Sequence, residues 1–106
     1  MTAKYITVRA SVRLLTIEEG GRFNPVPGPG SYRPNHNFFS AGNNEMTIGF
    51  IELPDEQGLR LGEARELVIS FWPWERLDGE IYPGREWVLQ EGSKVVGHGR
   101  VLEVMG

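Results

Sequence analysis

Few side chains in this sequence are of the kinds that hold metal ions or cofactors. The only histidines are His36 and His98, and cysteine is absent. A zinc or other transition-metal site needs several histidine, cysteine or carboxylate ligands that converge on one point. Nothing in the spacing of the two histidines predicts such convergence, so we expect no metal and no cofactor.

A hydrolytic triad can be assembled on paper from Ser31, Asp78 and His98. Such a set can be found in almost any sequence and means nothing without a shared geometry. The phosphate-binding pattern GxxxxGK[ST] does not occur, so nucleotide hydrolysis is not expected. We therefore expect the protein not to be an enzyme.

Arg33 is the most distinctive charged residue, because it lies between Tyr32 and the rigid Pro34. An arginine in such a position either stacks on an aromatic ring and bonds loop carbonyls, or binds a ligand. We favour the loop-stabilising role and keep ligand binding as the alternative.

Trp72 and Trp74 flank Pro73 and form a second distinctive group. We expect one of them in the core and the other exposed. An exposed tryptophan is common at interfaces because it buries a large rigid surface at low entropic cost. The pair forms either a lid packed over one end of the fold or an anchor for a partner, so both are candidate protein-interface residues.

The composition predicts a single domain over residues 1–106. The chain has 11 Lys and Arg against 14 Asp and Glu, a net charge of -3, which argues against a general nucleic-acid binder. The absence of cysteine permits a reducing compartment. No segment has the pattern of a signal peptide or the roughly 20 apolar residues of a membrane helix. We expect a cytoplasmic protein without a membrane partner.

The elements that must position these residues are strands. Alternating or β-branched apolar patterns indicate strands over residues 5–14, 36–39, 46–53, 66–72, 86–91 and 94–104. No segment favours a helix. Gly97 and Gly99 share one face of the last strand, which indicates a close approach by another part of the chain. We expect an all-β fold, and a small six-stranded antiparallel barrel rather than a sandwich, because closure removes exposed edges.

A long connection spans residues 20–39 and contains four prolines. Proline fixes its own φ and lacks an N–H, so we expect this connection to contain neither a helix nor an interior strand. Connections of this length are uncommon in compact domains and often carry function. We expect functions particular to this protein in residues 25–30 and at Trp74.

Four landmarks occur in a fixed order: EGGR at 19–22, GSYRPN at 30–35, IELP at 51–54 and LQEGSKVVGHG at 89–99. Together they resemble the C-terminal (third) domain of bacterial elongation factor Tu, over nearly the whole chain. The resemblance implies a six-stranded antiparallel β-barrel that is not catalytic. In that family the domain packs against the GTPase and second domains, meets the nucleotide-exchange factor and contacts the T stem of aminoacyl-tRNA.

The resemblance also implies site residues. The tRNA-contacting tip of the last hairpin corresponds to Gln90, Glu91 and Gly92, and the end of the long loop corresponds to Asn35. If RNA is bound, we expect its phosphates to meet a basic patch. The candidate members of that patch are Arg22, Arg33, Lys94 and Arg100.

Three functions follow as hypotheses. The first is a non-catalytic protein-interaction module related to the third domain of elongation factor Tu, without GTPase activity, that binds a protein partner or self-associates. The second is an RNA-binding protein of the translation apparatus that contacts a tRNA T stem. The third is a decoy or immunity-type protein that competes with elongation factor Tu for a partner.

Overall fold

The computed structural model describes residues 4–39 and 46–106. It contains seven β-strands and one short 3-10 helix. In chain order the elements are β1 (Ile6–Leu14), β2 (Gly30–Tyr32), β3 (Asn35–Asn37), β4 (Thr47–Leu53), β5 (Ala64–Phe71), η1 (Glu75–Leu77), β6 (Glu86–Glu91) and β7 (Lys94–Val104). Within these described ranges, no helix is long and apolar enough to cross a membrane.

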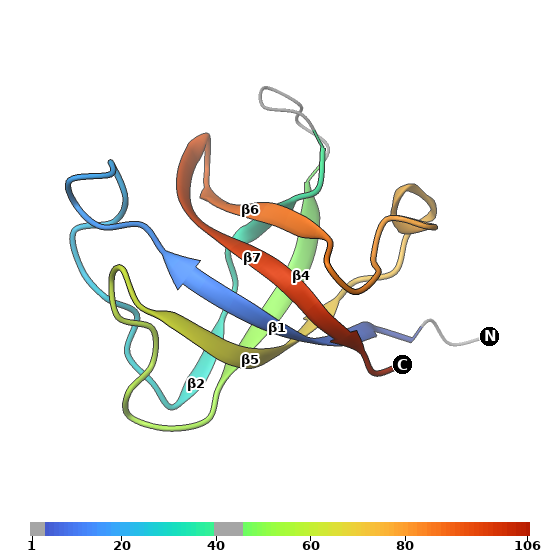
Figure 1. The fold of residues 1–106 in the computed structure, drawn as a ribbon, viewed down its shortest axis with the longest axis horizontal. Coiled ribbons are helices and arrows are strands. Elements are labelled where there is room, and N and C mark those ends of the chain that lie inside the picture. Colours follow the sequence, from blue (N-terminus) through green and yellow to red (C-terminus); the bar gives the residue numbers. More distant parts are fainter. Residues whose placement is uncertain (1–3, 40–45) are drawn as a thin grey trace.

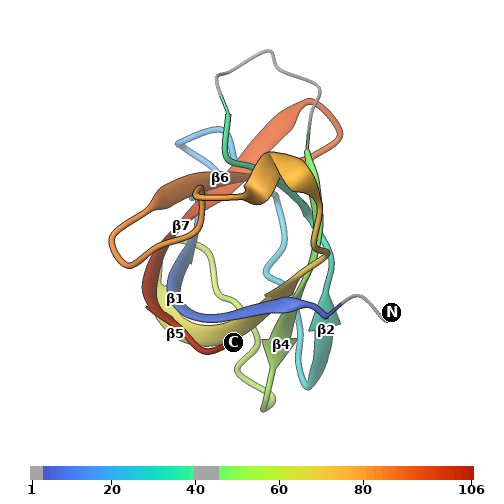
Figure 2. The same cartoon turned by 90° about the vertical axis from the view of Figure 1, so that its right-hand side faces the viewer.

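Six of the strands close into an antiparallel barrel. The order around the ring is β4-β3-β6-β7-β1-β5, and pairing of β5 with β4 completes it. Figure 1 shows the long strands β1, β5 and β7 running side by side. Figure 2 looks along the barrel and shows the strands arranged around its axis. The predicted all-β class and six-stranded antiparallel barrel are confirmed.

The seventh strand, β2, lies outside the ring and pairs only with β4. It continues β3 along the same edge of β4, with Tyr32 opposite Ile51 and Asn35 opposite Ile48. The interruption falls at Arg33 and Pro34. The prediction that residues 20–39 contain no interior strand was wrong at Asn35–Asn37, which form β3 of the ring. A proline removes a ladder hydrogen bond only at its own position.

The rest of the proline-rich connection packs against the segment that follows β4. Val26 forms a two-way backbone bridge with Leu59, with N···O distances of 2.9 and 2.8 Å. Gly28 and Gly58 allow the two segments to touch, since a Cβ on Gly58 would stand 2.0 Å from the Val26 carbonyl oxygen. The connection is therefore built into one end of the barrel.

The core is aromatic at its centre. Phe38 stacks on Trp87 with ring centroids 5.3 Å apart, and Phe71 meets both rings edge to face. His36 completes the group: its Nδ1 accepts a hydrogen bond of 3.0 Å from Trp87 Nε1. The histidine is fully buried. Around these rings lie aliphatic side chains from β1, β4, β5 and β7.

Two glycines on β7 make room for this arrangement, as their shared face predicted. A Cβ on Gly99 would lie 2.6 Å from the Trp87 ring, and one on Gly97 would lie 2.7 Å from the Arg13 carbonyl oxygen. Both are shorter than any ordinary carbon contact. The large indole therefore fits inside the barrel only because the strand opposite carries no side chain there.

We predict that Gly99→Ala destabilises the protein by about 1–3 kcal/mol, the range typical of an overpacked core. Urea unfolding followed by Trp fluorescence measures this as a lower midpoint. Arg100→Ala, which changes the next residue and an exposed side chain, should stay within about 0.5 kcal/mol of the unchanged protein. Equal midpoints for the two variants would contradict the packing role of Gly99.

Candidate interaction surfaces

The outer wall of the barrel carries an aromatic cluster, which we call the outer aromatic face: Tyr5, Ile48, Phe50 and Trp72. Side chains alternate along β4, so Gly49 and Ile51 point inward while Ile48 and Phe50 point outward. Trp72 follows β5 directly and donates its backbone N–H to the Ile48 carbonyl at 2.8 Å. The β4–β5 ladder therefore places Trp72 beside Ile48.

Tyr5 joins the members of this face. Its ring meets the rings of Phe50 and Trp72 edge to face, each at a centroid distance of 5.5 Å. Even so, Tyr5 is 41% exposed, Trp72 47% and Ile48 61%. A contiguous exposed apolar group of this kind is typical of an interaction site.

Arg33 borders the outer aromatic face. It is exposed, and its guanidinium lies 4.9 Å from the centroid of the Phe50 ring. The structure therefore shows the stacking that the sequence favoured. Within the described part of the chain, no carboxylate or carbonyl accepts a hydrogen bond from Arg33.

Trp74 is placed differently from Trp72. It is half-buried, packs against the core and donates from Nε1 to Thr47 Oγ1 at 3.2 Å. Of the two tryptophans, Trp72 is thus the exposed one. Between them lies a hollow of about 280 Å³. Its lining residues are Met46, Thr47, Ile48, Trp72 and Trp74.

A second group of predicted residues gathers at the β6–β7 hairpin, and we call it the hairpin cluster: Arg22, Tyr32, Glu91 and Lys94. The Glu91 carboxylate accepts hydrogen bonds from Arg22 and from the Tyr32 hydroxyl, the latter at 2.6 Å. Lys94 lies 5.2 Å from the centroid of the exposed Phe23 ring. Burial, together with Glu91, raises the pKa of Tyr32 above its ordinary value.

Gln90, beside this cluster, is a structural residue. It is 7% exposed, and its Oε1 accepts a hydrogen bond of 2.9 Å from Asn37 Nδ2. Its backbone pairs with Asn35, and its amide reaches the Gly92 carbonyl at 3.5 Å. The structure therefore brings Asn35, Gln90, Glu91, Gly92, Arg22 and Lys94 to one region, whereas Arg33 points away onto β4.

The four arginines and lysines expected to form a basic patch do not share one face. Arg22 and Lys94 belong to the hairpin cluster, and Arg33 stacks on β4. Arg100 stands on β7 opposite Glu86, and β4 and β7 lie on opposite sides of the ring. Register therefore places Arg100 on a different part of the barrel from Arg33.

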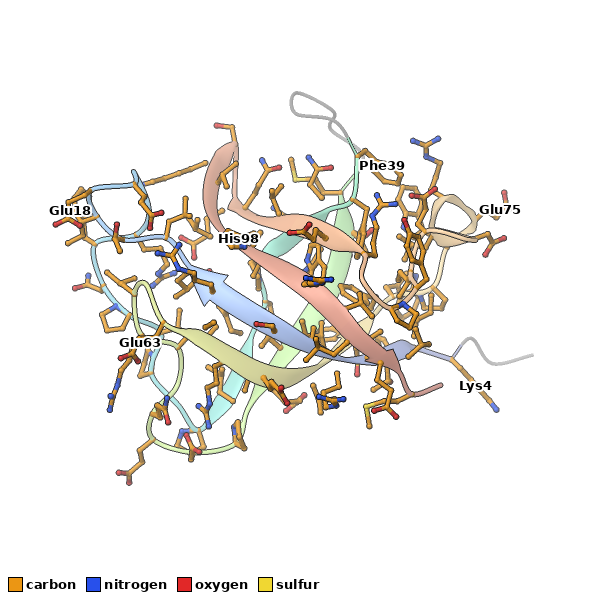
Figure 3. The ribbon with its side chains drawn as sticks, in the orientation of Figure 1. Lys4, Glu18, Phe39, Glu63, Glu75 and His98 are labelled. Carbon is orange, nitrogen blue, oxygen red and sulfur yellow. The ribbon has the colours of Figure 1, made fainter. Side chains whose placement is uncertain are left out.

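The residues considered for chemistry are also separated. Ser31 lies on β2, Asp78 follows η1 and His98 lies on the outer face of β7. Figure 3 shows His98 beside β7, far from the end of the molecule where Glu75 of η1 lies. His98 borders a shallow hollow of about 460 Å³ with Phe39, Glu86 and Val88. Among the described residues, no three His, Asp or Glu side chains form a metal-binding group.

His36 is enclosed by the core rather than presented to a ligand. Burial lowers its pKa to about 4, an effect that the Gly49 backbone partly offsets. Within the described ranges its Nε2 has no hydrogen-bond partner. Its ring packs at 5.0 Å, edge to face, against Phe71. The neutral form is therefore the one that the fold accommodates.

Sequence reasoning missed Tyr5, Ile48 and Phe50 as surface residues. The signal was present in residues 46–53, where apolar side chains occupy both alternating positions. Such a run is typical of a strand covered on both faces. Here only the inner face is covered.

In a comparison with models of known protein families, none matched this chain.

We predict a pH dependence of stability that comes from His36. Because its pKa is about 4 when folded and 6.5 when unfolded, the unfolded chain binds more protons between these values. The contribution of His36 to the free energy of unfolding is therefore fully present above about pH 6.5. It falls by about 3 kcal/mol as the pH drops to 4. Urea midpoints at a series of pH values measure it.

The NMR signal of the His36 ring provides the direct check, and His98→Gln identifies which histidine signal belongs to His36. A midpoint near 6.5 in the folded protein would contradict the assignment. Carboxylates act in a lower window: hydrogen bonding to Arg13 lowers the pKa of Glu19 from 4.5 to about 2. Its contribution is lost only below about pH 4.5.

For the hairpin cluster we predict that Glu91→Gln lowers the pKa of Tyr32, because a carboxylate that opposes tyrosinate formation is lost. Burial should still hold this pKa above that of a free tyrosine. Ultraviolet titration measures it. The loss of stability should stay below about 1 kcal/mol, since the Arg22–Glu91 pair is partly exposed. Glu63→Gln serves as the control and should leave the tyrosine titration unchanged.

Proposed function

We propose that this protein is a non-catalytic protein-interaction module. The observation that carries the proposal is the outer aromatic face, where Tyr5, Ile48 and Trp72 stay 41–61% exposed on the wall of a closed barrel. Large aromatic side chains left in water represent apolar surface that a partner can bury. Tyrosine and tryptophan are also the residues most enriched among those that dominate binding energy.

The face is pre-organised for binding. Tyr5, Phe50 and Trp72 hold one another edge to face, and the β4–β5 ladder fixes the backbone that carries two of them. Little side-chain freedom is therefore left to lose when a partner docks. A rigid aromatic surface beside an open hollow is the arrangement expected of a docking site.

The sequence landmarks support a more specific form of the proposal. The order of EGGR, GSYRPN, IELP and LQEGSKVVGHG resembles the third domain of elongation factor Tu, a barrel that works by docking. A shared architecture alone does not establish function, so this kinship is part of the proposal. The decoy hypothesis adds that the partner is shared with elongation factor Tu.

RNA binding has less support. The expected basic patch is dispersed, and Arg22 is neutralised by Glu91. Phosphate contacts from several cations on one face supply most of the affinity of RNA-binding proteins. The pull-down below includes a nuclease-treated sample, which separates RNA-mediated capture from direct protein binding.

We predict that Trp72→Ser abolishes the capture of partner proteins by the tagged protein, because it removes the largest exposed ring of the outer aromatic face. The measurement is a quantitative pull-down from lysate, with and without nuclease. Phe23→Ser is the matched control: Phe23 is 73% exposed but belongs to the hairpin region. It should retain the partners.

Urea unfolding shows whether Trp72→Ser is folded, and we expect a loss within about 1 kcal/mol, as for an exposed side chain. Capture that survives Trp72→Ser but is lost in Phe23→Ser would show that the partner binds at the hairpin region instead. Capture of nothing by the unchanged protein, together with a strict monomer in light scattering, would overturn the proposal.

A further inference from the structure

We propose that the outer aromatic face binds an acidic peptide segment of a partner protein, in which a large apolar side chain fills the hollow beside Trp72 and a nearby carboxylate pairs with Arg33. The inference rests on the proposed interaction function. It adds the chemical class of the partner and the two contacts that select it.

The Arg33 guanidinium is prepared for a carboxylate. Its central carbon lies over the Phe50 ring, 4.9 Å from the ring centroid. A guanidinium that stacks on an aromatic ring keeps its in-plane N–H donors available. Those donors match the two oxygens of a carboxylate, which can accept them as a bidentate pair.

Several other arginines already have carboxylate partners. Arg9 pairs with Glu66, and Arg65 pairs with Asp55 at 2.5 Å. Arg22 pairs with Glu91. For Arg33, no carboxylate partner is found within the described ranges. An anionic group brought by a partner would therefore gain an ion pair without breaking one.

Charged side chains of both signs lie near the face, and the exposed Glu75 directly follows Trp74 of the hollow. Lys4 precedes Tyr5 and is exposed; in Figure 3 its side chain extends outward at the end of the molecule opposite Glu18 and Glu63. Glu52, the acidic residue of β4, faces Ser31, two pairs farther from the hollow than Arg33. A carboxylate close to the apolar anchor meets Arg33 before it meets Glu52.

The register sets the expected spacing. Arg33 follows Tyr32, whose partner is Ile51, so it stands across from Phe50 and diagonally from Ile48. Diagonal neighbours in an antiparallel sheet are about 7–8 Å apart. An extended peptide covers that distance in about two to three residues. The predicted ligand therefore has an acidic residue two or three positions from its apolar anchor.

The hollow, with a volume of about 280 Å³, is large enough for one side chain. Its walls are mostly apolar, with Ile48 and Trp72 at the outer edge and Trp74 deeper, held by its bond to Thr47. An aromatic or leucine side chain of a peptide can enter it while the peptide backbone stays outside.

The test is selection of a random peptide library, displayed on phage, against the full-length protein, with counter-selection on Trp72→Ser. We expect the enriched peptides to carry an aromatic or leucine residue with Asp or Glu two or three positions away. The most enriched peptide and its counterpart with Asn or Gln in place of the acid are then synthesised with a fluorophore. Fluorescence anisotropy gives the Kd of each.

With Arg33→Gln we expect the acidic peptide to bind about fivefold more weakly, the effect of a partly exposed ion pair of about 1 kcal/mol. The neutral counterpart should bind Arg33→Gln and the unchanged protein equally well. Arg60→Gln, which removes an exposed arginine from the opposite end of the barrel, should change neither Kd. Added salt should weaken the acidic peptide alone.

Enriched peptides without an acidic residue, an absence of enriched peptides, or equal effects of Arg33→Gln and Arg60→Gln would each overturn the inference. So would dimers or bound RNA that disappear with Trp72→Ser, because another occupant would then hold the face. The proposed function fails separately, if Trp72→Ser captures the same partners from lysate as the unchanged protein. The two failures are therefore distinguishable.

Discussion

The contact on which this barrel depends is the hydrogen bond from Trp87 to His36 at its centre. Both rings are buried, and the bond gives each a partner for a polar nitrogen that would otherwise be lost from water. Two glycines make it possible: Gly99 leaves space for the indole and Gly49 for the imidazole. The interior therefore accepts large rings on β3 and β6 and requires the absence of a side chain at Gly49 on β4 and at Gly99 on β7.

The same alternation that fills the interior builds the outer surface. On β4, Gly49 faces His36 inside while its neighbours Ile48 and Phe50 face solvent. On the segment that pairs with β4, His36 points inward and Arg33 points outward. A shift of one residue in this register would reverse both sets at once. Core packing and the outer aromatic face are thus two consequences of one pairing.

Local patterns predicted most of the strands. Residues 86–91 and 94–104 match β6 and β7, and 46–53 differs from β4 by one residue. Gly97 and Gly99 were predicted as points of close approach, because a glycine inside a strand often marks a place where another segment packs closely. The short β2 was missed, because it is surrounded by prolines. None of these prolines lies within β2 itself. Closure of the ring follows from pairing between distant segments, which no local window contains.

The candidate site was only partly predictable for a related reason. Trp72 was recognised from its type, and Arg33 from its place beside a proline. Tyr5, Ile48 and Phe50 were not, because an apolar residue on the outer face of a strand has the same local pattern as one beneath a covering layer. Which face is covered depends on barrel closure. Exposure is therefore a property of the whole fold, whereas the tendency to form a strand is local.

The existing ion pairs determine which charged side chains can still bind a partner. In the hairpin cluster Glu91 already receives Arg22 and Tyr32, so an incoming anion would have to compete with an existing carboxylate. At the outer aromatic face, Arg33 contacts the Phe50 ring. A competing internal partner weakens recognition even where the residue types suit it. Gln90 and Glu91, implied by the resemblance, are therefore held by bonds within the fold, whereas Arg33 lies beside exposed rings.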